Sequence, residues 1–261
     1  MSFRYSGPRL DKYKVLIADT YEQMEADATK ILQSTDTVLG FDTEMVDARV
    51  TPQYMRVTQT GARYGPTMLI QLATTDHVFL FHFHRMLGSP PSQWELPPSL
   101  QKILRSDKYI KIGIATHNDN EGLNRTFGLS GVAQLIDLRA VGLSLGLPFN
   151  SLRDIAVWYG RTDLDKQTPH DWTCSLYAGE AVRYEAIEYA ALDAIICRQA
   201  HRRLLAQFVS SMPSTVATNT TTTKRQESME DSEQRHIRLD KYNRPVMRVI
   251  VPVGVPHTNN D

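Results

Sequence analysis

Short apolar segments alternate along most of the chain with segments whose apolar residues recur at helical spacing. The β-prone runs occupy residues 14–18, 38–44, 68–73, 78–83, 109–114 and 135–137. The helix-like segments cover residues 21–32, 100–106, about 118–127, 138–145, 151–159 and 180–208. Strands that alternate with helices along a chain predict a single α/β domain in which helices cover a sheet.

This alternation stops near both ends of the chain. Residues 1–13 are polar and predict a flexible lead-in, so the domain is expected to span residues 14–208. A Ser- and Thr-rich stretch that becomes acidic predicts a linker over residues 209–234. Residues 235–261 are first basic and then β-prone. This tail would add an edge strand, dock on the domain or stay disordered.

The strand at residues 38–44 ends in two acidic side chains. Because side chains alternate along a strand, Asp42 and Glu44 should project from the same face. Two carboxylates at one buried point repel each other, and a divalent cation such as Mg²⁺ or Mn²⁺, which prefers oxygen ligands, would neutralise them. A turn or a helix cap at the strand end would explain the same residues, so the interpretation depends on further acids.

A third carboxylate interrupts an apolar helix face far along the chain. Within residues 180–208 one face carries Val182, Ala186, Tyr189, Asp193 and Ile196. Asp193 does not suit a core, so it needs a partner or a metal. Tyr189 lies one turn earlier, where its hydroxyl can reach the same point. A buried aspartate with a satisfied partner is the alternative.

Asp119 is a fourth candidate acid. It follows the strand at residues 109–114 and lies at the start of a predicted helix. Asn118 or Asp119 would make a good helix N-cap, so a structural role explains Asp119 as well as a metal-binding role does.

The irregular stretch 47–66 combines basic and aromatic residues directly after the strand acids. It contains Arg49, Arg56, Arg63, Tyr54 and Tyr64. Guanidinium groups and aromatic rings suit a phosphate backbone and stacked bases. A solvated surface loop of the same composition is the alternative.

Together these positions resemble the DEDD superfamily of 3′→5′ exonucleases, in its tyrosine-containing branch (DEDDy). The residues that match its three motifs are Phe41-Asp-Thr-Glu44, His117-Asn-Asp119 with Leu123, and Tyr189-x-x-x-Asp193. Further similar segments are Leu69-Ile-Gln-Leu72, Phe79-Leu-Phe-His82, Ile112-Gly-Ile114, Asn150-Ser-Leu152 and Asp171-Trp172. Within the superfamily the chain is most similar to the ribonuclease D and Werner-type exonuclease domain, over roughly residues 14–205.

The resemblance implies a ribonuclease H-like α/β fold with a mixed five-stranded sheet flanked by helices. It also implies a metal-dependent hydrolase that removes 5′-mononucleotides from the 3′ end of RNA or DNA by two-metal-ion catalysis with Mg²⁺ or Mn²⁺. Asp42, Glu44, Asp119 and Asp193 would hold the two ions, and Tyr189 would orient the attacking water. The expected nucleic-acid contacts are Arg49, Arg56, Arg63, Tyr64 and Lys166.

Composition narrows the partners and the compartment. The formal net charge is zero, so a nucleic acid would have to be bound by a local basic patch. The two cysteines form no disulfide framework and favour an intracellular, reducing compartment. Since no apolar run approaches the length of a membrane span, no membrane partner is expected. The sequence leaves the protein partners unknown.

Two other classes of function compete with the exonuclease hypothesis. A metal-independent small-molecule α/β enzyme lacks support, because no glycine-rich nucleotide loop or nucleophile elbow follows a strand. A non-catalytic module of the same fold, which binds RNA or a protein partner, is the stronger alternative.

Overall fold

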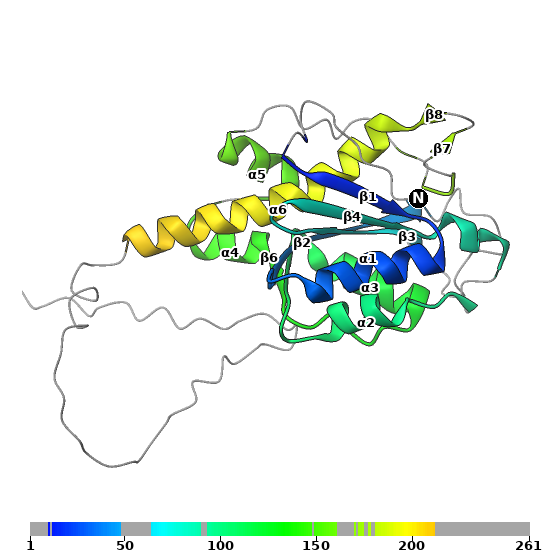
Figure 1. Cartoon of the computed structure of the whole chain (residues 1–261). Helices are drawn as coiled ribbons and strands as arrows, with labels where there is room; N and C mark the ends of the chain where they lie inside the picture. Colours follow the sequence, from blue (N-terminus) through cyan, green and yellow to red (C-terminus); the bar gives the residue numbers. More distant parts are fainter. Residues whose placement is uncertain are drawn as a thin grey trace, which may run out of the picture. The chain divides into compact units, whose positions relative to one another are not determined.

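A mixed sheet of six strands forms the centre of the computed structural model (Figure 1). The strands are β1 (Lys14–Ala18), β2 (Val38–Asp47), β3 (Tyr64–Ala73), β4 (His77–His82), β5 (Ile110–Gly113) and β6 (Leu135–Asp137). Their order is β1-β4-β3-β2-β5-β6, with antiparallel pairs β2–β3 and β3–β4 and parallel pairs elsewhere. The structure describes residues 10, 12–47, 64–89, 93–147, 149–160, 170, 172–174, 177–178 and 181–211.

The six β-prone runs between residues 14 and 137 all join this sheet, so the sheet has six strands where five were expected. One edge is formed by β6, whose three residues pair in parallel with β5 from Lys111↔Leu135 to Gly113↔Asp137. A strand this short has little stability by itself and is held by the backbone of its neighbour. The α/β class is confirmed.

Helices cover both faces of the sheet (Figure 1). They are α1 (Tyr21–Gln33), α2 (Pro98–Arg105), α3 (Thr116–Phe127), α4 (Leu138–Ser144), α5 (Leu152–Tyr159) and α6 (Tyr184–Ser211), with the 3₁₀ helix η2 (Phe83–Gly88) and a small hairpin of β7 (Tyr177–Ala178) and β8 (Ala181–Val182). Buried residues of α1, α2 and α3 pack against Leu39 and Phe41 of β2, whereas α5 and α6 pack in a second core on the other face. Because strand side chains alternate, Asp42 and Glu44 face α6.

A close backbone approach fixes α6 against β2. A Cβ atom on Gly40 would lie only 1.9 Å from the carbonyl oxygen of Ala194, so a larger side chain at Gly40 would push the helix away. Ala190, Ala191 and Ala194 are all fully buried, and their small side chains let the helix lie near the sheet. This contact brings Asp193, the neighbour of Ala194, towards the end of β2.

The long helix differs from its expected bounds at both ends. It begins at Tyr184 and not at residue 180, because β7 and β8 pair in a hairpin before it. Val182 pairs with Tyr177 in that hairpin, so its assignment to the helix stripe is wrong. At the other end α6 continues to Ser211, beyond the expected domain end at residue 208.

The chain divides into two units, Met1–Met212 and Pro213–Asp261, and every described residue belongs to the first. Leu10, which was expected in a flexible lead-in, is fully buried in the core on the α6 side. The expected linker beyond residue 211 and the tail at 235–261 lie outside the described residues. Among the helices that are described, none has the length and apolar character needed to cross a membrane.

Candidate metal centre

The two acids of β2 lie where the regular pairing of the strand ends. β2 pairs with β5 from Val38 to Gly40, and its register with β3 shifts after Glu44. Asp42 and Glu44 are both half-buried on the α6 side. The sheet therefore presents two carboxylates at the end of a rigid strand, with part of each side chain accessible.

Asp193 completes a group of three carboxylates. It is fully buried on α6, with 0% of its surface exposed. One oxygen each from Asp42, Glu44 and Asp193 lies within 4.8 Å of the others. The structure thus brings together the strand pair and the helix aspartate, as the sequence predicts, while their catalytic roles stay predictions.

The donor set of this carboxylate group suits a hard divalent cation. Three negative groups at such short separations repel one another unless a cation or protons neutralise them. Oxygens bound to one Mg²⁺ at about 2.1 Å lie up to about 4.2 Å apart, so small side-chain rotations would place all three on one ion. Asp42, Glu44 and Asp193 can therefore hold a metal ion.

Asp119 lies on α3 and reaches β2 from the opposite face. Its buried carboxylate accepts a 2.6 Å hydrogen bond from the hydroxyl of Thr43, whose side chain points away from those of Asp42 and Glu44. Burial raises the pKa of Asp119 above its usual range, although the hydrogen bonds from Thr43 act in the other direction. Asp119 is therefore bonded to the residue between the two strand acids, and it is not a member of the group of three.

The prediction that Asn118 or Asp119 caps α3 is wrong. The helix begins at Thr116, and its N-cap residue Ala115 has a left-handed backbone (φ 55°, ψ 34°) without a side-chain capping bond. Asp119 is therefore inside the first turn of the helix, where the dipole of the helix favours a negative charge. Its assignment as a fourth metal ligand stays a prediction.

Tyr189 lies one helical turn before Asp193 and belongs to an aromatic wall. The ring of His170 meets Tyr189 edge-on with 4.9 Å between ring centroids, and the Trp172 ring lies 6.4 Å from Tyr189. The Nε2 atom of His82 is 2.9 Å from the carbonyl oxygen of Trp172. Burial lowers the pKa of His82 to about 4, so this ring is neutral at pH 7 and donates one hydrogen bond to that carbonyl. His170, Trp172 and Tyr189 form this aromatic wall, which limits the orientations of the Tyr189 ring one helical turn from Asp193.

Gln71 is a polar residue of this region to which the sequence analysis gave no role. It is the direct cross-strand partner of Asp42 in the antiparallel β2–β3 pair, so both side chains project from the same face. Gln71 is fully buried, and neither atom of its amide has a hydrogen-bond partner among the described residues. The sequence feature that could have indicated a role for Gln71 is its position as the one polar residue in the apolar run 68–73.

Most of the expected nucleic-acid contacts lie outside the described residues. These are Arg49, Arg56, Arg63 and Lys166. Tyr64 is the first residue of β3 and pairs with Asp47, but its side chain also lies outside the description. Their roles in binding stay predictions.

A comparison with known families identifies the family to which this domain belongs. A family model described as 3'-5' exonuclease matches residues 15–208. This chain belongs to the 3'-5' exonuclease family. The matched region runs from β1 to α6, so it contains the carboxylate group, Asp119 and the aromatic wall.

One curated member of the exonuclease family is similar along much of the domain. Exonuclease 3'-5' domain-containing protein 2 of Drosophila melanogaster is 28% identical over 172 residues. The match covers 65% of this chain and 26% of that protein, so the chain spans about a quarter of the length of this relative.

Solved exonuclease structures share the fold. The catalytic core of RRP6 from Trypanosoma brucei has a TM-score of 0.59 and 20% identity, covering 80% of this chain and 50% of that chain. Escherichia coli RNase D has a TM-score of 0.55 and 23% identity, with coverages of 76% and 46%. The EXO domain of Aedes aegypti Nibbler has a TM-score of 0.55 and 20% identity, with coverages of 80% and 93%. The predicted ribonuclease H-like fold is thereby confirmed.

Proposed function

We propose that this chain is a metal-dependent 3′→5′ exonuclease of the tyrosine-containing DEDD branch, of the ribonuclease D and Werner type. It would hydrolyse phosphodiester bonds of RNA or DNA from a free 3′ end and release 5′-mononucleotides. The observation that carries this proposal is the convergence of Asp42, Glu44 and Asp193 from β2 and α6 in a chain of the exonuclease family.

Each carboxylate has a distinct part in the proposed site. Two Mg²⁺ or Mn²⁺ ions, when bound, would stabilise the attacking and leaving oxygens of an in-line displacement. Asp42 would be shared by both ions, Glu44 and Asp193 would complete the site that activates water, and Asp119 would hold the second ion, partly through water. Because Asp42 and Glu44 are half-buried, part of each of these side chains is accessible.

Tyr189 would orient the attacking water by a hydrogen bond from or to its hydroxyl. A phenol is too weak an acid to be the resting base at neutral pH, so its part is positioning and not proton removal. The edge-on contact with His170 and the nearby Trp172 support this assignment, because they limit the orientations of the ring.

Substrate contacts would come from the basic and aromatic residues Arg49, Arg56, Arg63, Tyr64 and Lys166. If the three arginines contact phosphates, replacing all three with alanine should raise KM and flatten the dependence of KM on salt concentration, because fewer counterions are released on binding. Measurement of KM at several salt concentrations checks this. If the dependence of KM on salt concentration were unchanged, residues 47–66 would be interpreted as a surface loop without a role in binding.

The decisive experiment follows 5′-labelled RNA and DNA oligonucleotides, single-stranded and with recessed 3′ ends, in Mg²⁺, Mn²⁺ and EDTA. The proposal expects a ladder that shortens from the 3′ end with a divalent ion and no degradation in EDTA. Comparison of the substrates also gives the preference for RNA or DNA. Absence of degradation with either ion on every substrate would contradict the proposal.

A non-catalytic module that binds RNA or a protein partner is the second candidate. It is favoured by the position of Asp119, which is hydrogen-bonded to Thr43 on the far face of β2 and is not in the group of three acids. The oligonucleotide experiment separates the two, since this module would bind the labelled strand without shortening it.

A further inference from the structure

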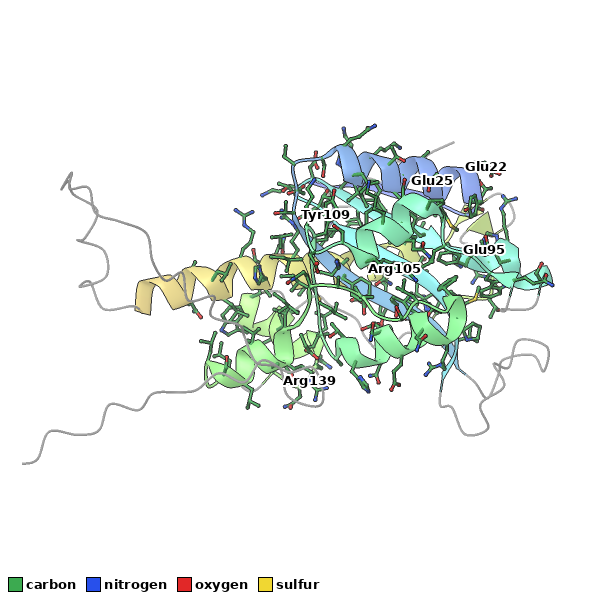
Figure 2. All side chains as sticks on the ribbon, turned by 90° about the horizontal axis from the view of Figure 1, so that it is seen from below. Glu22, Glu25, Glu95, Arg105, Tyr109 and Arg139 are labelled. Carbon is green, nitrogen blue, oxygen red and sulfur yellow. The ribbon has the colours of Figure 1, made fainter. Side chains whose placement is uncertain are left out.

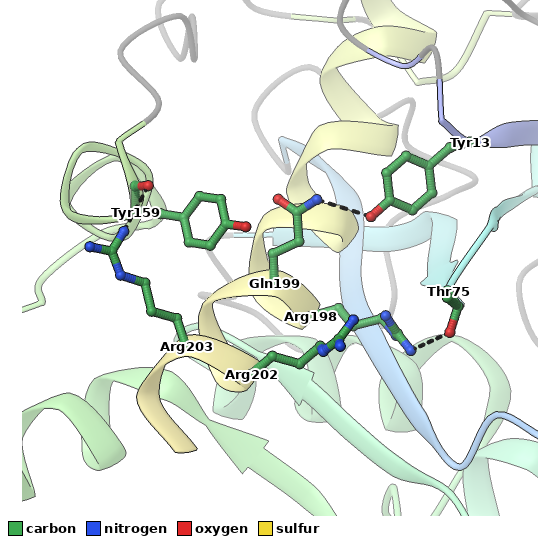
Figure 3. Close-up of a pocket in the computed structure, with 7 residues that line it drawn as sticks. All are labelled: Tyr13, Thr75, Tyr159, Arg198, Gln199, Arg202 and Arg203. Atoms are coloured by element: carbon green, nitrogen blue, oxygen red, sulfur yellow. Dashed lines mark hydrogen bonds between the residues drawn. The ribbon is translucent and has the colours of Figure 1, made fainter. Parts of the chain in front are cut away.

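A second concave site lies towards the other end of α6. The pocket has a volume of about 560 Å³, and its lining includes Arg198, Arg202, Arg203, Gln199, Tyr13 and Tyr159 (Figure 3). Arg202 follows Asp193 by nine residues, which is about 13.5 Å along a helix axis. Arg198 bonds the carbonyl oxygen of Val38 at the start of β2, whereas Asp42 and Glu44 lie towards the other end of that strand.

Arg198 is the structural cation of this pocket. Its Nε atom donates to the Val38 carbonyl oxygen at 3.0 Å, and one of its terminal nitrogens donates to the Asp36 carboxylate and the Thr75 hydroxyl. Figure 3 shows the bond to Thr75. Burial tends to raise the pKa of Asp36, but hydrogen bonds from Thr75 and the guanidinium of Arg198 outweigh it and hold the pKa below its usual range. Asp36 thus stays ionised and neutralises Arg198.

Arg202 and Arg203 supply the remaining positive charge. Arg203 donates to the carbonyl oxygen of Tyr159 at 2.9 Å, and its guanidinium lies 4.7 Å from the centre of the Trp158 ring. Arg202 is exposed and makes no hydrogen bond or ion pair with the described residues. One guanidinium is therefore held in place by aromatic stacking, and the other is available for an incoming anion.

Gln199 adds an amide group whose two polar atoms differ in their surroundings. Its Nε2 atom donates to the Tyr13 hydroxyl at 3.0 Å, whereas its Oε1 atom is buried and has no hydrogen-bond partner among the described residues. In Figure 3 the amide projects between the rings of Tyr13 and Tyr159. An unsatisfied buried oxygen costs free energy, so a ligand with a hydroxyl or amino donor would gain by entering here.

Positive charge, aromatic rings and one unsatisfied acceptor describe a ligand with an anionic group, a flat ring and a hydrogen-bond donor. We propose that this pocket binds a nucleotide, with its phosphate on Arg202 and Arg203, its base or sugar donor on Gln199, and its ring against a tyrosine. The nucleotide is either free or one unit of a strand. This binding needs neither the carboxylate group nor hydrolysis, so it stands apart from the proposed exonuclease activity.

The test measures binding by calorimetry in EDTA, with the full chain carrying Asp42→Asn. EDTA and this substitution prevent metal-dependent binding and cleavage at the carboxylate group. The probes are 5′-AMP, adenosine and single-stranded oligoadenylate. The variant Arg202→Glu reverses the charge of the exposed arginine. Its matched control is Arg105→Glu, which changes an exposed arginine at the end of α2 (Figure 2).

Arg202→Glu should weaken nucleotide binding by about tenfold or more, which corresponds to the loss of one charge-assisted hydrogen bond. The control should bind as the parent does, and both should melt at the parent temperature. If Arg202→Glu lowers the affinity for 5′-AMP alone, the ligand is a free nucleotide. If it lowers the affinity for the oligonucleotide alone, the ligand is a unit of a strand, and lower affinity for both probes supports either source.

Three results would overturn the nucleotide pocket. These are no binding of any probe by the parent, equal affinities of the Arg202→Glu and Arg105→Glu proteins for every probe, or adenosine binding as tightly as both 5′-AMP and oligoadenylate. None of them depends on whether the wild-type chain degrades nucleic acid, because binding is measured without metal. Failure of the exonuclease proposal and failure of the pocket are therefore distinguishable.

Discussion

Asp193 and Asp119 are both buried aspartates on helices that pack against β2, yet their surroundings differ. Asp193 comes from α6 and meets two further acids within 4.8 Å. Asp119 comes from α3 and accepts a hydrogen bond from Thr43, the residue between those two acids, on the opposite face of the strand. One short segment of β2 therefore serves two different environments through the alternation of its side chains.

The difference shows what each environment needs to be stable. Three converging carboxylates require positive charge, which a divalent cation provides. A single carboxylate with a hydroxyl donor can be retained by hydrogen bonding and by partial protonation, and burial raises its pKa accordingly. Asp193 should therefore respond to metal ions strongly, and Asp119 to a smaller degree.

Replacement of Asp193 with asparagine is expected to have the largest effect. The amide keeps the shape and removes the charge, so both the degradation of oligonucleotides and the rise in Tm on addition of Mg²⁺ should be lost. Activity assays and thermal melts with Mg²⁺ or EDTA measure this. Glu185→Gln, an exposed change in the first turn of α6, is the control. A wild-type Mg²⁺ shift in Tm for Asp193→Asn would contradict the metal site.

Replacement of Asp119 with asparagine should cost less activity. The carboxylates of Asp42, Glu44 and Asp193 remain able to hold one ion, so rates should recover in part as the Mg²⁺ concentration rises. Titration of the rate with Mg²⁺ checks this. Thr43→Val removes the hydrogen bond but keeps the Asp119 carboxylate, and it should retain more activity. Wild-type rates for Asp119→Asn at every Mg²⁺ concentration would limit Asp119 to a structural role.

The substitution Tyr189→Phe tests the proposed role of the Tyr189 hydroxyl in orienting water, and it removes no carboxylate. Loss of one hydrogen bond to the attacking water should lower kcat by about tenfold, with KM and the Mg²⁺ dependence close to wild type. Steady-state kinetics on the preferred oligonucleotide separates kcat from KM. A loss as complete as that of Asp193→Asn would mean that the phenol does more than position water.

His82, which is bonded to the Trp172 carbonyl next to the aromatic wall, should make the stability of the fold depend on pH. The pKa of His82 is lowered to about 4 by burial, whereas an unfolded histidine has a pKa of about 6.5. Between these values the unfolded state binds more protons, so the free energy of unfolding should fall as pH drops from about 6.5 to 4, by roughly 3 kcal/mol. Urea denaturation at several pH values checks this. In His82→Gln the slope over this window should be shallower, and an unchanged slope would assign it to other groups.

Several elements were predictable because the interactions that define them are local. The side chain of Thr20 accepts a hydrogen bond from the backbone N–H of Gln23 and caps α1, and these two residues are three positions apart. Asp137 likewise caps α4 by accepting from the backbone N–H of Arg139. Strand alternation placed Asp42 and Glu44 on one face, because that pattern depends on adjacent residues alone.

Other features depended on contacts between distant segments. Asp119 and Thr43 are separated by 76 positions, and no periodicity within α3 shows which face of β2 the helix covers. The helix α6 also begins at Tyr184 and not at the predicted residue 180, because Val182 pairs with Tyr177 in a hairpin. A regular pattern in the sequence cannot reveal such competition between local helix formation and pairing with another segment.

The sequence by itself therefore determined the α/β class, the order of most elements and the two segments that carry the carboxylate group. Tertiary structure decided how these segments meet. The contact of Gly40 with the backbone at Ala194 brings Asp193 to Asp42 and Glu44, and packing of α5, α6 and β1 gathers the arginines and tyrosines of the nucleotide pocket. The physical reason is that periodicity records which side chains are buried, whereas the partner of each buried or charged side chain depends on how separate elements pack.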